Sequence, residues 1–375
     1  MGEYIVKPLP PKADLESKRI LKKLPEAHRF LAELKGMAAT IPNESILINT
    51  LALQEAKDSS AIENIITTHD ELYKAMLFEE LFTDAAAKEI SNYVEALKHG
   101  FQNVRSNKFL SSNHILDIQR ILEKNDAGYR KLPGTSLINQ TTGEKVYTPP
   151  QSYQAIVELM DNLVMFINDK EMLDVDPLIK MAVIHFQFES IHPFYDGNGR
   201  TGRIINILYL VMNDLLDLPI LYLSRYIIRH KGDYYRLLQG IRDNDSWEDW
   251  IIYMLNGIEE TSKETIELIK NIRQMMQSYK HRIREELPKI YSQDLLNNLF
   301  RHPYTKIEFL MKDINVTRLT ARRYLDELVE LGLLEKQKIW RTYFYINTPL
   351  YQMFKGETVQ ENTPPIKTVN PSLNK

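Results

Sequence analysis

Two strongly apolar stretches with helical periodicity flank one short polar run, and this arrangement constrains the fold of the chain more than any other feature. Asp176 followed by Pro177 is typical of an N-cap and a first helical residue, and apolar positions then repeat on one face up to about Ser190. Apolar residues at helical spacing resume from 204 to 211. The polar run, residues 192–203, therefore joins two buried helices and lies at one end of a helical core.

The polar run reads His-Pro-Phe-Tyr-Asp-Gly-Asn-Gly-Arg-Thr-Gly-Arg. Gly199 to Arg203 would form the first turn of the second helix, whose unpaired backbone N–H groups favour an anion. Gly197 and Gly199 let a phosphate approach the backbone. Arg200 and Arg203 are three residues apart and face the same way, and two guanidiniums suit a polyphosphate.

Two further side chains of the run complete a set for phosphate chemistry. Asp196 offers a hard oxygen ligand beside the glycines, and Mg²⁺ binds through one or two carboxylates together with substrate phosphates. His192 can serve as a general base near neutral pH. A structural histidine followed by a plain glycine turn is the alternative. We favour a site for phosphate chemistry over this alternative, because all the groups occur at fixed spacing between two helices.

At these residues the chain resembles the Fic family, whose motif is H-x-F-x-[D/E]-G-N-G-R-x-x-R; every fixed position is met. The resemblance implies a compact all-α core and transfer of AMP from ATP to a Tyr, Thr or Ser hydroxyl of a protein. It implies that His192 deprotonates that hydroxyl and that Asp196 holds Mg²⁺. The related kinase Doc carries Lys where this chain has Gly199, which favours nucleotidyl transfer over phosphorylation.

The resemblance also implies which residues contact the nucleotide. Asn198 and Gly199 would help to form an anion hole, and the two arginines would hold the phosphates. Tyr234 and Tyr235 resemble a pair that lies near the adenine in the family, although aromatic residues at that spacing are equally compatible with a core. The expected nucleotide-binding residues are Glu63, Gly197, Asn198, Gly199, Arg200, Thr201, Gly202, Arg203 and Tyr234.

A second family feature lies far upstream. Ser59 to Asn64 fits [S/T]-x-x-x-E-[G/N], the inhibitory-helix motif of Fic proteins. The resemblance implies that Ser59, Glu63 and Asn64 form an inhibitory element in which Glu63 pairs with Arg203 and denies it to the ATP γ-phosphate. Without the resemblance, Ser59 and Glu63 would simply be neighbours on a solvated helix face.

Residues 129–150 contain two short extended runs around a polar, glycine-containing turn, which predicts a β-hairpin; an irregular surface loop is an equal alternative. In the Fic family a hairpin here is a flap that docks the target segment by strand addition. The resemblance therefore implies that Thr135, Ser136, Leu137 and Ile138 dock the target.

Composition and charge exclude several other classes of protein. The chain has 375 residues, of which 43% are hydrophobic and 26% charged, as in ordinary globular proteins. The formal net charge of −3 indicates no general affinity for nucleic acid or membrane, and the absence of cysteine excludes disulfides and thiolate metal sites. No signal peptide and no run of 18 apolar residues is seen, so we expect a cytoplasmic protein without a membrane partner.

The fold class expected is mainly α: an all-α Fic core with a small β-hairpin flap, plus a C-terminal winged-helix domain. Residues 1–20 read as an extended lead, and Trp247 and Trp250 are expected in the core. The expected organisation is an N-terminal helical Fic/Doc extension with the inhibitory motif at 1–110, a catalytic core at 111–258, a linker helix at 259–290, a winged helix at 291–350 and a disordered tail at 351–375.

The winged-helix expectation rests on helices at 305–313 and 317–331, followed by two strands within 335–346. Six basic residues there could meet DNA phosphates: Arg318, Arg322, Arg323, Lys336, Lys338 and Arg341. The net formal charge of residues 301–350 is only +3, from nine Lys/Arg and six Asp/Glu. DNA binding and a protein or dimer contact therefore stay equally open.

These features together predict a protein adenylyltransferase that uses ATP and Mg²⁺, modifies a protein that includes itself, and is autoinhibited by Glu63. Two alternatives stay open. One is a hydrolase that removes AMP from a modified protein, with Glu63 activating water. The other is a DNA-binding regulator whose Fic core only senses nucleotide. A homo-oligomeric state is also left open.

Overall fold

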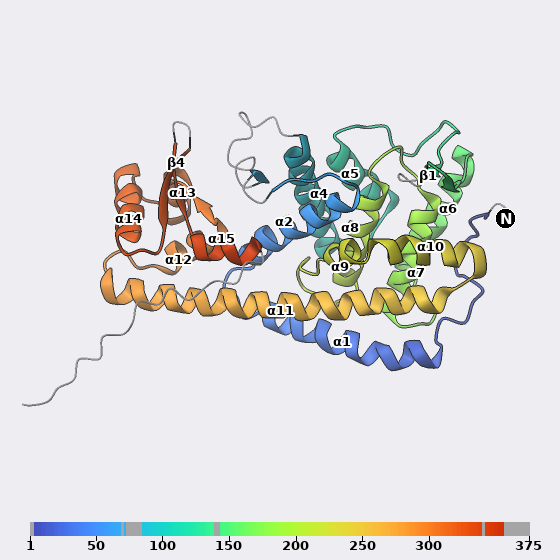
Figure 1. The fold of residues 1–375 in the computed structure, drawn as a ribbon, viewed down its shortest axis with the longest axis horizontal. Helices are drawn as coiled ribbons and strands as arrows, with labels where there is room; N and C mark the ends of the chain where they lie inside the picture. Colours follow the sequence, from blue (N-terminus) through green and yellow to red (C-terminus); the bar gives the residue numbers. More distant parts are fainter. Residues whose placement is uncertain (1–3, 69–70, 73–84, 139–142, 340–341, 356–375) are drawn as a thin grey trace, which may run out of the picture. The chain divides into compact units, whose positions relative to one another are not determined.

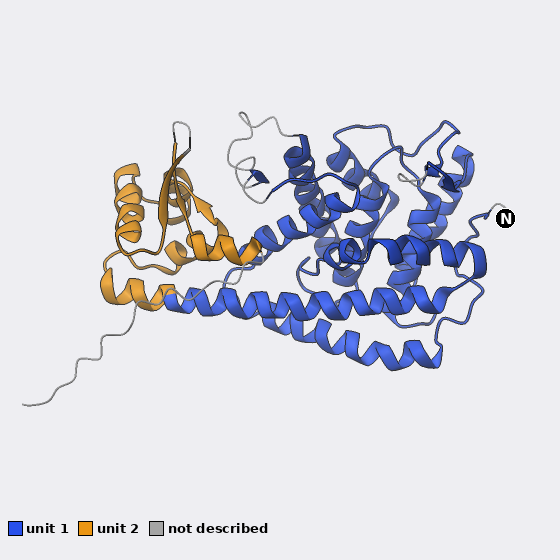
Figure 2. Cartoon of the chain, in the orientation of Figure 1, with its two compact units in different colours: residues 1–278 blue, residues 279–375 orange. Residues whose placement is uncertain are grey.

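The computed structural model describes residues 4–68, 71–72, 85–138, 143–339 and 342–355. The chain divides into two compact units, residues 1–278 and 279–375 (Figure 2). One long helix, α11 (Trp247–Glu286), contains the boundary. Each unit is described by itself below.

In its described residues, the first unit has helices and one small hairpin as its regular structure, which confirms the fold class expected for it (Figure 1). Its strands β1 (Leu137–Ile138) and β2 (Lys145–Tyr147) pair antiparallel. Its helices before α11 are α1 (Lys18–Ala38), α2 (Glu44–Ile62), α4 (Ala85–Asn107), α5 (Ser112–Glu123), α6 (Tyr153–Asn168), α7 (Pro177–Ile191), α8 (Asn198–Met212), α9 (Ser224–Arg229) and α10 (Lys231–Asn244).

Helices α7 and α8 form the centre of this unit because they are apolar on nearly all sides. Every residue of α7 from Leu178 to Ile191 is buried, and α8 is buried almost to its end. A helix that is apolar all round must lie inside a core. They pack on each other, α6 covers α7, and α4 and α5 cover α8.

The N-terminal cap of α7 is the one that its sequence predicts. Asp176 accepts a hydrogen bond from the backbone N–H of Leu178 at 2.8 Å, and Pro177 occupies the first turn. The helix ends at Ile191, one residue beyond the expected end. The site histidine therefore lies immediately after a rigid, fully buried helix.

The N-terminal lead is packed on the core rather than a free extension. Its apolar residues Val6, Leu9 and Leu15 are buried. The side chain of Asn162 accepts a bond from the backbone N–H of Leu9 at 2.7 Å and donates one to its carbonyl at 3.1 Å. An extended segment can be held in this way because side chains replace the strand partner that its backbone lacks.

Helix α11 begins about twelve residues earlier than the long helix expected from residue 259. Trp247 and Trp250 lie in its first turn and are buried, as predicted. Helix α1 runs beside this part of α11 (Figure 1), and Arg19 pairs there with Asp249 at 2.7 Å. The last residues of the expected core and most of the expected linker thus belong to one continuous helix.

The second unit contains the predicted pair of helices followed by a hairpin. The helices are α13 (Ile307–Ile314) and α14 (Arg318–Glu330), and the hairpin is β4 (Glu335–Ile339) with β5 (Thr342–Ile346). Gly332 has the positive φ of 73° expected of a helix stop. The sequence analysis missed α12 (Gln293–Arg301), the short strand β3 (Tyr304–Thr305) and α15 (Thr348–Lys355).

The three strands of the second unit form one antiparallel sheet in the order β3-β5-β4. The hydroxyl of Tyr279, at the end of α11, donates to the Leu333 carbonyl at 2.9 Å and lies 3.0 Å from Asn347 Oδ1. Helix α15 occupies the first residues of the expected tail, whose remainder lies outside the described residues. Among those that are described, no helix combines the length and apolar character of a membrane span.

Candidate active site

His192 follows α7 in the left-handed conformation, with φ 49° and ψ 60°. Its backbone N–H still donates to the Phe188 carbonyl at 2.9 Å, so the residue is fixed to the helix end. Burial, reinforced by the charges of Arg130 and Arg242 and opposed by Glu63, lowers the pKa of His192 to about 4. The imidazole is therefore neutral at physiological pH and able to accept a proton.

The turn after His192 is held by Asn198. Its Oδ1 accepts the backbone N–H of Phe194 at 2.8 Å, and its Nδ2 donates to the Phe194 carbonyl at 2.9 Å. Gly197 then takes φ 77°, a conformation that favours glycine, and α8 begins. The predicted helix N-terminus is therefore present six residues after the histidine, and the first backbone N–H groups of a helix favour an anion.

Carboxylate oxygens lie close to the glycines of this turn. A side chain at Gly199 would collide with Glu63 Oε1, and one at Gly197 would collide with Glu123 Oε1. A Cβ at Gly202 would lie 2.7 Å from Glu189 Oε1. Three carboxylates, from the C-cap of α2, from α5 and from α7, therefore approach the anion cradle, which we define as residues 197–203.

Arg203 is the residue at which the inhibitory motif meets the cradle. Its guanidinium, 2% exposed, donates from Nε to Ser59 Oγ at 2.7 Å and from Nη2 to the Ser59 carbonyl at 3.0 Å. Nη2 also pairs with Glu63 Oε1 at 2.9 Å. The structure thus brings together Ser59, Glu63 and Arg203, although they are about 140 residues apart in the chain.

The sequence pattern predicts that Glu63 lies inside a helix. In the structure Glu63 is instead the C-cap of α2. Burial opposes the ionisation of Glu63, yet the charge and hydrogen bond of Arg203 outweigh it and hold the pKa of Glu63 below its usual value. Asn64, with φ 64°, turns away and accepts a bond from Lys231 at 3.2 Å. The contact with Arg203 is therefore made by the end of the helix.

Arg200 faces carboxylates that the sequence analysis did not single out. It pairs with Glu89 of α4 at 2.8 Å and with Glu123 of α5 at 2.9 Å, and it is almost fully buried. Burial raises the pKa of Glu123 to about 6, opposed by Arg200 and reinforced by Asp196. Arg200 therefore anchors the cradle to α4 and α5, and its contact with phosphate stays a prediction.

Asp196 lies beside the cradle with its side chain 77% exposed. Its Oδ1 accepts the backbone N–H of Gly197 at 2.7 Å, which leaves the other oxygen facing outward. One exposed carboxylate next to a phosphate cradle fits Mg²⁺, which takes most of its other ligands from phosphates and water. Among the described residues, no three His, Cys, Asp or Glu side chains form a ready-made metal cluster.

The predicted hairpin is present, with Leu137 opposite Tyr147 and Ile138 opposite Lys145. Thr135 and Ser136 precede β1, the side chain of Ile138 is 58% exposed, and the turn at 139–142 lies outside the described residues. The Tyr147 hydroxyl donates to the Ser190 carbonyl at 2.7 Å, which attaches the hairpin to the end of α7. Docking of a target by residues 135–138 stays a prediction.

Tyr234 lies in the core of the first unit. Its hydroxyl is 2.9 Å from His185 Nε2, and its ring contacts that of Trp250. Burial lowers the pKa of His185 to about 3, so the ring is neutral, and its Nδ1 lies 2.9 Å from Asn206 Nδ2. The neighbouring Tyr235 is 48% exposed. Contact of Tyr234 with a nucleotide stays a prediction.

Sequence reasoning missed two buried charged residues beside His192. Arg130 is buried and donates from Nε to the His192 carbonyl at 2.8 Å. Glu189, one turn before the histidine, has a buried Oε1 without a hydrogen-bond partner among the described residues, and burial raises its pKa to about 7. The sequence could have indicated Glu189, because it is the single acidic residue in an apolar helix. Arg130 lies in a loop, where no sequence pattern predicts burial.

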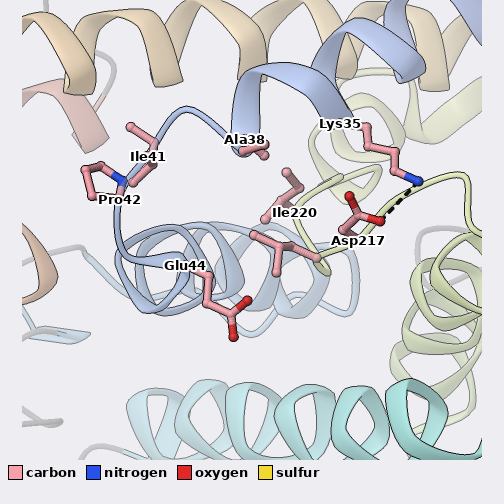
Figure 3. A pocket seen from close by; sticks show the side chains of 9 residues that line it. Lys35, Ala38, Ile41, Pro42, Glu44, Asp217 and Ile220 are labelled. Carbon is pink, nitrogen blue, oxygen red and sulfur yellow. Dashed lines mark ion pairs between the residues drawn. The ribbon is translucent and has the colours of Figure 1, made fainter.

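A cavity of about 330 Å³ lies elsewhere in the first unit, between the end of α1 and the start of α2 (Figure 3). Lys35 and Asp217 form a 3.0 Å ion pair on its wall, and Glu44 also lines it. None of the residues predicted to bind nucleotide borders this cavity. The site described above is therefore defined by its side chains and not by this cavity.

Three family models match successive parts of the chain. They are the Fic/DOC family N-terminal model at residues 21–102, the Fic/DOC family model at 109–210, and the C-terminal domain model of SoFic-like protein adenylyltransferases at 275–350. The chain belongs to the Fic/DOC family.

Curated relatives match over shorter stretches. The protein adenylyltransferase fic-1 of Caenorhabditis elegans is 38% identical over 63 residues, which are 17% of this chain and 12% of that protein. A probable protein adenylyltransferase of Aquifex aeolicus is 37% identical over 81 residues, or 22% of this chain and 24% of that one. The matched stretch thus spans less than a quarter of either relative.

Solved structures show that the fold is that of Fic proteins. A Fic family protein from Desulfovibrio desulfuricans G20 superposes with a TM-score of 0.58 at 19% identity, covering 90% of this chain and 98% of that chain. A Fic-1 fragment from C. elegans superposes with a TM-score of 0.50 at 19% identity, covering 67% and 73%. At such identities the likeness concerns the fold alone.

Proposed function

We propose that this protein transfers AMP from Mg·ATP to a Tyr, Thr or Ser hydroxyl of a protein, including itself. The observation that carries the proposal is a neutral His192 directly before an anion cradle at the start of a buried helix. The match to family models for adenylyltransferases supports the same reaction class.

In this proposal the cradle binds the phosphates through its backbone N–H groups, and Arg203 adds a guanidinium once Glu63 leaves. Asp196 would hold Mg²⁺, which supplies charge neutralisation to the phosphates when it is bound. His192 accepts the proton of the target hydroxyl. The hydroxyl oxygen then bonds to the α-phosphorus of ATP, and the bond from that phosphorus to pyrophosphate breaks.

The low pKa of His192 belongs to a site without phosphates. Positive charges from Arg130 and Arg242 disfavour the imidazolium here. A bound polyphosphate brings negative charge, which favours the imidazolium and raises the pKa of the histidine toward the range in which a general base is most efficient. Substrate binding would therefore strengthen the base that acts on the target.

We further propose that the structure represents the inhibited state. Glu63 forms an ion pair with Nη2 of Arg203, and its Oε1 also fills the space above Gly199. An ATP γ-phosphate that needs Arg203 must displace this carboxylate, so nucleotide binds unproductively until α2 moves. A hydrolase that removes AMP is the second candidate, because Glu63 is ionised and about one third exposed and could activate a water.

DNA binding by the second unit receives less support than either reaction. Arg318, Arg322 and Arg323 each have a carboxylate neighbour, at 2.7, 3.5 and 3.6 Å. Lys336 also has a carboxylate neighbour, since it forms an ion pair with Asp326. Phosphates would have to compete with these acids, and acidic side chains on a binding face oppose a polyanion.

A comparison of label transfer from the α-phosphate and from the γ-phosphate of ATP tests the proposal. The full-length protein and a lysate are incubated with ATP labelled on either the α- or the γ-phosphate, and protein-bound label is measured after electrophoresis. Transfer from the α-label only, lost in His192→Ala, is the expected result. Transfer from the γ-label would indicate a kinase. Release of AMP from a modified protein that requires Glu63 would instead favour the hydrolase.

A further inference from the structure

Arg130 is a buried guanidinium that binds carbonyl oxygens and no carboxylate. Its Nε donates to the His192 carbonyl at 2.8 Å, and its Nη2 donates to the carbonyl of Pro150 and, at 3.4 Å, to that of Ile191. Its backbone N–H donates to the Pro193 carbonyl at 2.8 Å. Within the described ranges, no ion pair involves this residue.

These acceptors belong to the segments that must meet for the proposed reaction. Ile191 and His192 end helix α7, where unpaired carbonyls carry partial negative charge and attract a cation. Pro150 follows the second strand of the hairpin, and Arg130 precedes its first strand. One side chain thus joins the base of the hairpin to the backbone of the histidine.

The His192 backbone needs such a support because its conformation is uncommon. A residue with a side chain takes the left-handed region rarely, and it stays there only when its surroundings hold it. Arg130 binds the carbonyl of this residue through Nε and, at 3.4 Å, the carbonyl of Ile191 through Nη2. These carbonyls belong to the peptide groups on the two sides of the His192 Cα, so one guanidinium holds both groups.

We propose that Arg130 is the positioning residue of His192: its buried hydrogen bonds hold the histidine backbone in the left-handed conformation, and its charge acts on the imidazole. The kinetic part of this inference rests on the proposed AMP transfer. The electrostatic part can be measured without any turnover.

The charge of Arg130 reaches His192 because no acid neutralises it. Burial is the first cause that lowers the pKa of His192, and Arg130 is the second; Arg242 acts in the same direction, and Glu63 opposes both. Arg242 differs in its contacts, since its guanidinium stacks on the Tyr147 ring at 4.0 Å. Arg130 is thus the cation that both contacts the histidine backbone and depresses the pKa of its ring.

Two substitutions separate the charge from the hydrogen bonds. Arg130→Gln removes the charge, whereas Arg130→Lys keeps the charge but replaces the planar fork by a point donor that cannot make all the bonds. Lys131→Gln is the matched control, because it removes a positive charge from an exposed side chain at the next position. All variants are made in the full-length chain, and circular dichroism and thermal melting verify folding.

The first measurement is the titration of His192 by NMR with labelled histidine, with His192→Gln to assign its signal. Arg130→Gln should raise the midpoint of His192 by about one pH unit, since a nearby charge typically moves a pKa by that much or more. Arg130→Lys and Lys131→Gln should leave the midpoint near that of the parent. An unmoved midpoint in a folded Arg130→Gln protein would overturn the electrostatic part.

The second measurement is AMP transfer in the Glu63→Gln background, in which the proposed inhibition is relieved. We expect kcat to fall roughly tenfold to a hundredfold in both Arg130 variants, as for a misplaced catalytic group, while the KM for ATP stays unchanged. The acid limb of kcat/KM should move to higher pH in Arg130→Gln only. A purely structural role would lower activity without moving that limb, and a kcat equal to the parent in Arg130→Lys would refute positioning.

The outcomes remain separable if one part fails. If Arg130→Gln does not fold, the Arg130→Lys protein still decides, because a reduced kcat with an unchanged KM for ATP and an unchanged Tm supports positioning, and an undiminished kcat refutes it. If the parent transfers no AMP, the proposed function fails, whereas the titration still tests whether Arg130 acts on His192.

Discussion

Removal of the Glu63 carboxylate should activate the protein, and the structure sets the size of the effect. Glu63 makes one hydrogen-bonded ion pair, at 2.9 Å, with a guanidinium that is 2% exposed. Charged hydrogen bonds contribute about 1.5–3 kcal/mol. Since 36% of the Glu63 side chain is exposed to solvent, we take the lower half of that range. A stabilisation of about 1.5–2 kcal/mol corresponds to roughly a tenfold to thirtyfold change in the competent population.

The position of Glu63 makes even a glycine substitution informative. Glycine inside a helix costs about 1 kcal/mol, but α2 ends at Ile62 and Glu63 is its C-cap. Arg203 also keeps both of its bonds to Ser59 after the change. Glu63→Gly and Glu63→Gln should therefore retain the fold and both increase activity, and the Gln variant also keeps the size of the side chain.

The assay is self-modification with α-labelled ATP, followed over time in the wild type and both Glu63 variants. Glu95→Gln serves as the control, because it removes a carboxylate from an exposed ion pair with Lys124 and should not activate. Arg203→Ala combined with Glu63→Gln should suppress the gain. If folded Glu63 variants modify themselves no faster than the wild type, the contact with Arg203 is not inhibitory and our reasoning is wrong.

Three further expectations concern single side chains. His192→Ala should reduce transfer by about 10²–10⁴-fold while calorimetry still detects ATP binding, since the cradle does not need the imidazole. Asp196→Ala should abolish the response of transfer to added Mg²⁺; a titration that matches the wild type would limit Asp196 to its bond with Gly197. Burial raises the pKa of Glu189 to about 7 in the folded protein, whereas the unfolded chain releases this proton near pH 4.5. The free energy of unfolding therefore decreases as the pH rises from about 4.5 to about 7. Glu189→Gln should therefore raise Tm relative to the wild type more at pH 8 than at pH 5, whereas an equal difference at both would contradict the assigned pKa.

The helices α7 and α8 could be predicted because their signals are local. An Asp-Pro cap, two long apolar stretches and a glycine-containing turn act over a few residues, and the structure confirms both helices to within one residue of the expected ends. The close approach of Ser59 and Glu63 to Arg203 could not come from such signals. It required a resemblance to a family in which these distant segments are known to meet.

The features that sequence reasoning missed depend on contacts between distant segments. Glu89 and Glu123 lie on the surfaces of helices whose charged residues normally face solvent, and their role appears only when Arg200 packs against both. The continuity of α11 across residue 257 was missed for a similar reason. Gly257 resembles a helix boundary in the sequence, but a Cβ there would lie 2.7 Å from Leu223 and 2.8 Å from Tyr226, so this glycine permits close packing within a continuous helix.

In the proposed function, Gly199 explains why Glu63 and a phosphate would compete for the same site. The absence of a side chain at this position opens the backbone of the cradle to a phosphate, and the same open space is filled by Glu63 Oε1. A residue with a side chain at this position would force Glu63 Oε1 to move. In the proposed function the carboxylate and a phosphate would therefore share the space above one glycine, and a side chain there would restrict both ligands.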